Sequence, residues 1–109
     1  LSLIGNSCFK GCSSLTQISI PSTVTSIGDY SFTYCSSLTQ IQLPSSLKFL
    51  GNNVFEYCSK LTQIVIPPSL KFIGIDVFNH CSKLKHITIP STFGVNNIGI
   101  HFGIKITRY

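Results

Sequence analysis

Short apolar clusters recur along the chain, and each ends in an alternation of apolar and polar positions. In residues 38–43, LTQIQL, Ile41 and Leu43 alternate with Gln40 and Gln42. A period of two places successive side chains on opposite faces of a strand. The pattern therefore predicts a short strand with isoleucine and leucine directed inward and glutamine directed outward.

The pattern returns every 23 residues, and positions that recur at this interval form columns. Eight columns keep their residue type through the four repeats 1–23, 24–46, 47–69 and 70–92. They are Ile4/Ile27/Leu50/Ile73, Gly5/Gly28/Gly51/Gly74, Phe9/Phe32/Phe55/Phe78, Cys12/Cys35/Cys58/Cys81, Leu15/Leu38/Leu61/Leu84, Ile18/Ile41/Ile64/Ile87, Ile20/Leu43/Ile66/Ile89 and Pro21/Pro44/Pro67/Pro90. Such self-similarity is typical of a solenoid, in which each repeat forms one turn, or rung, stacked on the next.

Stacking places equivalent strands side by side in one direction, so we expect a parallel sheet with one short strand per rung. The proline after each strand has no N–H for the sheet and ends the strand there. The segment that follows, such as 45–51, is expected to return extended with Leu47 and Leu50 inward. Its final glycine can adopt positive φ or admit a neighbouring backbone closely.

The segment after the glycine column is expected to lie on the outside of the solenoid. Asn6, Asp29 and Asn52 follow the glycines and are good N-cap residues, and Asp76 stands one position later in the fourth repeat. We therefore expect a turn or two of helix in each outer segment, which gives an α/β fold class with short helical or irregular outer segments.

The last residues, 93–109, begin in register and then lose it. Phe93 occupies an apolar column of the repeat, and GIKITRY at 103–109 alternates like a final strand. Terminal repeats of solenoids are atypical because they cap the core. We interpret 93–109 as a degenerate fifth repeat and C-terminal cap.

The unit L-x-x-I-x-I-P-x-x-(V/L)-x-x-I-G-x-x-x-F-x-x-C resembles the BspA-type leucine-rich repeat over residues 1–92. The proline after the strand, the Ile-Gly pair and Phe-x-x-Cys carry the likeness. It implies a right-handed α/β leucine-rich-repeat solenoid, found in large surface-associated or secreted proteins of bacteria and single-celled eukaryotes. Several such proteins are regarded as adhesins that bind host or matrix proteins. Some members look intracellular, so a cell-surface or secreted location is favoured and a cytoplasmic one is the alternative.

Composition limits the classes of partner. The 109 residues suffice for one domain, 43% are hydrophobic and 10% charged, and the net charge is +5. The basic residues stand singly, unlike those of a nucleic-acid-binding patch, so we expect no nucleic-acid partner. No apolar run approaches the roughly 18 residues of a membrane span, and we expect none in this segment. The absence of methionine and a start inside a repeat predict a segment of a longer protein.

The cysteines are weighed as chemical groups and as packing. One column holds four of the five, where a metal site would need ligands that converge on one point and where adjacent rungs could form a disulfide. Because each lies three residues from an inward Phe and an inward Leu, we expect buried free thiols. Cys8 is expected to pack like Val54 and Val77 of its own column, and the alternative is an exposed or pairable thiol.

No residues are spaced for catalysis. The acids fall in different columns on different rungs: Asp29, Glu56 and Asp76. The histidines lack a Ser/Asp or Cys partner in a catalytic motif: His80, His86 and His101. The glycines recur at rung spacing rather than in a phosphate-binding loop. We therefore expect a protein that is not an enzyme and that uses neither a cofactor nor a metal.

The outward residues of the strands remain as the candidate binding surface, because the sheet face of a solenoid is the extended surface used for binding. They are amides and hydroxyls with a cationic end: Gln17, Ser19, Gln40, Gln42, Gln63, Val65, Lys85, His86 and Thr88. Such columns are also polar simply because they face water.

We predict a non-enzymatic protein-binding repeat module that meets a protein partner through this face, as part of a surface-associated adhesin or a host- or matrix-interacting protein. An intracellular scaffold or regulatory interaction domain and a purely structural spacer are the alternatives. Exposed rung ends would also permit end-to-end self-association.

Overall fold

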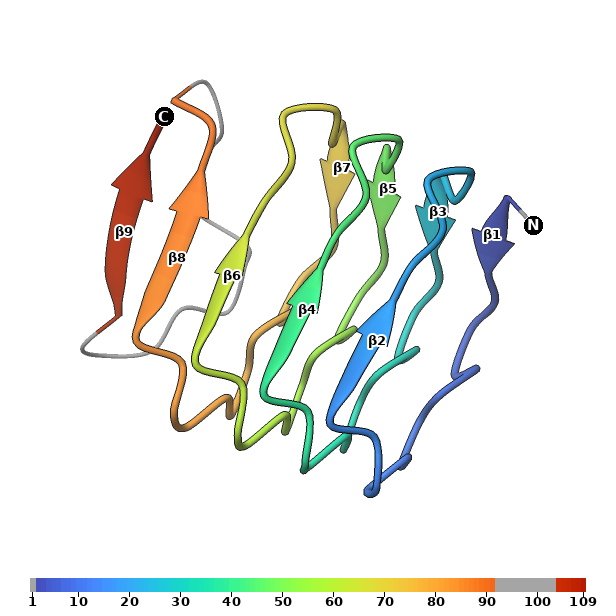
Figure 1. The fold of residues 1–109 in the computed structure, drawn as a ribbon, viewed down its shortest axis with the longest axis vertical. Helices are drawn as coiled ribbons and strands as arrows, with labels where there is room; N and C mark the ends of the chain where they lie inside the picture. The colour runs from blue at the N-terminus through green and yellow to red at the C-terminus, as the bar shows by residue number, and fades with distance from the viewer. Residues whose placement is uncertain (1, 92–103) are drawn as a thin grey trace.

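Each repeat contributes one short strand to each of two layers (Figure 1). The computed structural model describes residues 2–91 and 104–109. The back sheet is continuous, in the order β1 (Leu3–Ile4), β3 (Ser26–Ile27), β5 (Phe49–Leu50) and β7 (Phe72–Ile73). The front layer contains β2 (Gln17–Ser19), β4 (Gln40–Gln42), β6 (Gln63–Val65), β8 (His86–Ile89) and β9 (Lys105–Arg108). The result is a parallel β-solenoid of about four turns.

All the strand pairs are parallel, which confirms the predicted direction. Gln17 pairs with Gln40, and Gln63 pairs with His86, each 23 residues further along the chain. The front layer comprises two ladders, β2–β4 and β6–β8–β9. Thr62 N–H reaches Thr39 C=O at 3.4 Å where β6 follows β4.

One core lies between the two layers. Leu47 and Leu50 are fully buried, as predicted, and the isoleucine and leucine columns of the front layer pack against the same cluster. The Phe32, Phe55 and Phe78 rings stack along the solenoid with centroids 5.7 and 5.8 Å apart. A continuous apolar column of this kind is what excludes water from the stacked rungs.

The prediction of one strand per rung is wrong, because the return segment is itself a strand. Phe49 points outward while Leu50 is buried, and Gly51 N–H donates to Ile27 C=O of the previous rung at 2.9 Å. A two-residue strand is too short to show an alternating pattern in the sequence.

The α/β class and the helical outer segments are also wrong, because residues 2–91 and 104–109 contain no helix. No helix capable of crossing a membrane is therefore found in that part of the chain. In the outer segments, alternate N–H groups donate to the next rung: Phe32 to Val54 C=O at 3.0 Å and Tyr34 to Glu56 C=O at 2.9 Å. A helix would spend these donors within its own segment.

Asn6, Asp29 and Asn52 are not helix caps. Their side-chain oxygens accept backbone N–H groups of the next rung: Asn6 Oδ1 from Asp29, Asp29 Oδ1 from Asn52, and Asn52 Oδ1 from Ile75, at 2.8, 2.8 and 3.0 Å. Asp76 does not take the fourth place in this ladder; it adopts φ 53° in a turn. The residues that favour a cap thus bond between rungs instead of within one.

The predicted fifth repeat, 93–109, lies largely outside the described residues, as does His101. Its described end contains β9, which pairs in parallel with β8. His86 aligns with Lys105, 19 residues later, so this last pairing does not keep the 23-residue spacing. The role of this segment as a cap stays a prediction.

Candidate binding surface

The front layer presents two rows of outward side chains. Gln17, Gln40 and Gln63 form the first row, and all three are exposed. The second row holds Ser19, Gln42 and Val65, of which Val65 is 56% exposed. Inward neighbours such as Ile41 and Ile64 are buried, so the alternation predicted from the sequence fixes which side chains face out.

The fourth rung continues both rows. Lys85 is exposed just before β8, whereas His86 and Thr88 are half-buried because β9 lies alongside them. His86 Nε2 is 2.7 Å from Thr107 Oγ1. The nine predicted residues therefore share one layer, and β9 adds Lys105 and Thr107, which sequence reasoning missed. The irregular 19-residue spacing hid these two residues from a search at 23.

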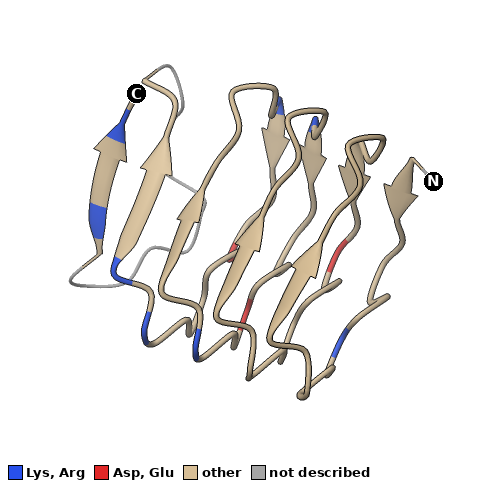
Figure 2. Ribbon diagram, viewed as in Figure 1, with Lys and Arg blue, Asp and Glu red and all other residues tan. Residues whose placement is uncertain are grey.

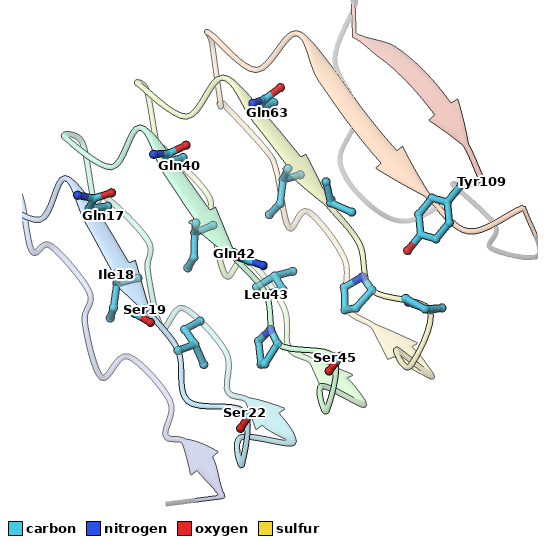
Figure 3. Close-up of a pocket in the computed structure, with 17 residues that line it drawn as sticks. Gln17, Ile18, Ser19, Ser22, Gln40, Gln42, Leu43, Ser45, Gln63 and Tyr109 are labelled. Carbon is cyan, nitrogen blue, oxygen red and sulfur yellow. The ribbon is translucent and has the colours of Figure 1, made fainter.

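A surface hollow runs along this layer near the proline ends of β2, β4 and β6 (Figure 3). Beside the glutamines, its lining includes residues that sequence reasoning did not select: Ser22, Ser45, Pro44, Pro67, Pro68 and Tyr109. The proline column and the serines next to it could have been found from the repeat. No repeated pattern pointed to Tyr109.

Tyr109 is held in place at one side of the hollow (Figure 3). Its hydroxyl donates to Ile66 C=O at 2.5 Å, and its backbone N–H donates to Ile89 C=O at 2.9 Å. The residue nevertheless stays 50% exposed. A fixed, half-exposed aromatic residue with an apolar body and a polar tip suits a contact surface.

Charge is distributed unevenly over the described residues (Figure 2). The acids lie in the outer segments, and the outward rows of β2, β4, β6 and β8 contain none. Lys85 and Lys105 make the end of the front layer at β8 and β9 basic. Complementary acidic groups on a partner would be attracted to that end.

The cysteine column forms a ladder of thiols in the core, as predicted for Cys35, Cys58 and Cys81, which are fully buried and free. Each Sγ donates to the carbonyl of a phenylalanine on the previous rung, at 3.2, 3.1 and 2.9 Å. Burial raises the pKa of Cys35 to about 11 and that of Cys81 to about 12, and it also raises the pKa of Cys58. Cys12 is half-buried.

Cys8 is exposed, so the prediction that it packs like a valine is wrong. Val54 and Val77 of the same column are fully buried between neighbouring rungs, whereas Cys8 lies on the first rung of the stack. Across residues 2–91 and 104–109, no three or more His, Cys, Asp or Glu side chains gather where they could hold a metal ion.

Parallel strands in 23-residue register over a leucine, isoleucine and phenylalanine core define a leucine-rich-repeat solenoid. The model of the BspA type leucine rich repeat region matches residues 2–102 in six copies. The chain belongs to this family, which confirms the resemblance carried by its sequence.

Solved structures support the same fold. A leucine-rich repeat protein of T. pallidum is 32% identical with a TM-score of 0.79, over 99% of this chain and 45% of that protein. A leucine rich cell surface protein of Faecalibacterium prausnitzii is 29% identical with a TM-score of 0.86, over 99% of this chain and 30% of that protein. The chain thus spans less than half the length of either. Comparison with curated proteins finds no match.

Proposed function

We propose that this chain is a protein-binding module that meets its partner through the outward rows of the front layer. The observation that supports this most is the state of the glutamine row: within the described residues, the amides of Gln17, Gln40 and Gln63 are exposed and make no hydrogen bond to the protein. Each amide offers two donors and two acceptor lone pairs. That capacity is available to a partner at every rung.

The surroundings of the row supply the other parts of an interface. Val65 and the prolines beside the hollow provide apolar contact, and Tyr109 adds an aromatic anchor of the kind enriched at interfaces. Lys85 and Lys105 at one end favour an acidic region of the partner and would fix its direction along the solenoid.

A cell-surface or secreted location and a role in adhesion are part of this proposal. They rest on family membership and on the likeness to the F. prausnitzii protein, which is described as a cell surface protein. Antibody labelling of intact cells that carry the full-length protein tests the location. Labelling that appears only after permeabilisation would favour the intracellular scaffold instead.

The binding face is tested with Gln40→Glu/Gln63→Glu. A photo-crosslinking side chain at Gln42 first identifies the partner, and calorimetry then measures the affinity of the purified pair. We expect affinity to fall by on the order of tenfold or more, because amide donors are replaced by like-charged acceptors. The melting temperature should hold, since both side chains are exposed and make no bond to the protein.

Ser13→Glu/Ser82→Glu is the matched control, because both serines are exposed outside the front layer and the charge change is the same. Its affinity should equal that of the wild type. An unchanged affinity for the glutamine variant would rule out this face and leave the spacer role.

A further inference from the structure

A second surface lies on the back sheet, away from the candidate binding surface. Phe49 of β5 and Phe72 of β7 are in register, and their rings stack with centroids 4.9 Å apart and planes at 9°. They are 39% and 49% exposed, whereas Leu50, the next residue after Phe49, is fully buried. The alternation that buries leucine in this strand leaves the two aromatic rings in solvent.

Two lysines accompany the rings. Lys48 and Lys71 precede Phe49 and Phe72 directly, and both are exposed. Lys71 N–H donates to Lys48 C=O at 2.9 Å, so the two cations stand on adjacent rungs, where the chain enters β5 and β7 (Figure 2). We call these four residues the Lys-Phe patch.

The patch contains only hydrocarbon and positive charge. The same two columns hold Ser2, Leu3, Thr25 and Ser26 on the first two rungs, so no acid neutralises the lysines within them. The acids of the described chain lie in the outer segments. A surface that covers the patch must therefore accept aromatic rings and supply negative charge.

An anionic lipid surface meets both needs without any directional hydrogen bond. Aromatic side chains enter the boundary between acyl chains and headgroups, while lysine stems lie along that boundary and place their ammonium groups among the phosphates. Each lysine near a negatively charged leaflet adds to the attraction. We propose that the Lys-Phe patch docks this solenoid onto a membrane surface that contains anionic lipid.

The orientation that results does not depend on the proposed partner face. The back sheet and the front layer bury their inward side chains in one core, so their outward sides face in opposite directions (Figure 1). Docking through the back sheet leaves the rows of the front layer open to solution. Lipid binding and protein binding can thus fail independently.

Co-sedimentation with vesicles tests the proposal. The wild type should sediment with vesicles made of equal parts of phosphatidylcholine and phosphatidylserine, and should stay in solution with pure phosphatidylcholine. Lys48→Glu/Lys71→Glu should lower the partition coefficient by on the order of tenfold or more. Lys60→Glu/Lys83→Glu is the matched control, because it makes the same charge change at two exposed lysines on the same rungs and should lower binding much less.

A spectroscopic reporter tests the rings. The chain has no tryptophan, so Phe72→Trp carries a single one, and its emission should shift to shorter wavelength and be quenched by brominated lipid. Val65→Trp on the front layer should show neither change. Phe49→Ser/Phe72→Ser should lose binding, and serine already occupies this column at Ser26. If that variant fails to fold by circular dichroism, the tryptophan reporter decides.

Several results would overturn the proposal. They are no binding of the wild type to the anionic vesicles, equal loss with Lys60→Glu/Lys83→Glu, and an unshifted Phe72→Trp emission in bound protein. Sedimentation velocity gives a further one: a wild-type dimer that Phe72→Ser converts to monomer would show that a second copy covers the patch.

Discussion

At the scale of single residues, the spacing between rungs depends on a pairing of glycine with a small polar side chain. A Cβ atom added at Gly51 would lie 2.4 Å from Asp29 Oδ1 and 2.7 Å from Asp29 N. The glycine therefore leaves room for the side-chain oxygen that accepts the N–H of Asn52. Two recurring columns that look separate in the sequence thus form one structural unit.

Gly51→Ala should destabilise the protein by about 1–3 kcal/mol, the usual effect of overpacking, because backbone atoms must shift. Gly5→Ala is the control, since nothing lies within 4 Å of a Cβ atom at that position. Urea unfolding measures both free energies of unfolding. Equal midpoints for the two variants would contradict the proposed role of the glycine column.

The buried thiols predict a loss of stability at alkaline pH. The pKa of Cys35 is about 11 and that of Cys81 about 12 in the folded protein, both raised by burial. The unfolded chain releases these protons at lower pH, so it binds fewer protons than the folded chain between the two pKa values, and the free energy of unfolding falls there. Below the ordinary cysteine pKa, this contribution to stability is fully present.

Urea unfolding across the alkaline range measures this slope, with Cys35→Ala and Cys81→Ala as the comparison because other groups also titrate. The double variant should lose less stability with rising pH than the wild type does. Identical slopes would show that the thiols are not shielded in the core.

At the scale of elements, the outer segments are stabilised by stacking rather than by helix formation. Tyr34, Tyr57 and His80 have φ between 60° and 63°, a region that bulky residues rarely adopt. Their rings stack with centroids 4.6 and 4.5 Å apart. Gly11 occupies the same column on the first rung with φ 75°. The stacks offset part of the strain that the left-handed turns introduce.

Tyr57→Ala and Tyr57→Gly separate these two effects. Both remove the stack, but only glycine relieves the left-handed conformation, so Tyr57→Gly should be the more stable of the two by about 1 kcal/mol. Thermal unfolding measures the difference. At an ordinary right-handed position alanine would be the more stable variant, so that order would refute the strain.

The sequence predicts the elements unevenly. A three-residue strand such as β4 shows its alternation in Ile41 and its neighbours, and the 23-residue period fixes the direction of pairing. The outer segments escape local prediction because Asp29 is equally suited to cap a helix and to accept an N–H from the next rung. Only the position of that neighbouring rung decides between these two bonds.

At the scale of the whole molecule, two opposite surfaces surround one core. The sequence placed the nine residues of the front layer correctly on one side, because alternation and period together determine which side chains face outward. It could not place Tyr109, since β9 joins β8 at a spacing that the repeat does not contain. Long-range features of this kind depend on the tail rather than on the repeated unit.

The two layers also differ in mechanical continuity. Hydrogen-bonded ladders join β1, β3, β5 and β7 without a break, whereas the front layer consists of separate ladders on either side of the β4 and β6 boundary. Stretching is resisted along the back, so bending of the solenoid concentrates at this boundary. The hollow draws its lining from both β4 and β6. Its width is therefore coupled to the curvature of the whole molecule, and a force that bends the solenoid changes the shape of the surface offered to a partner.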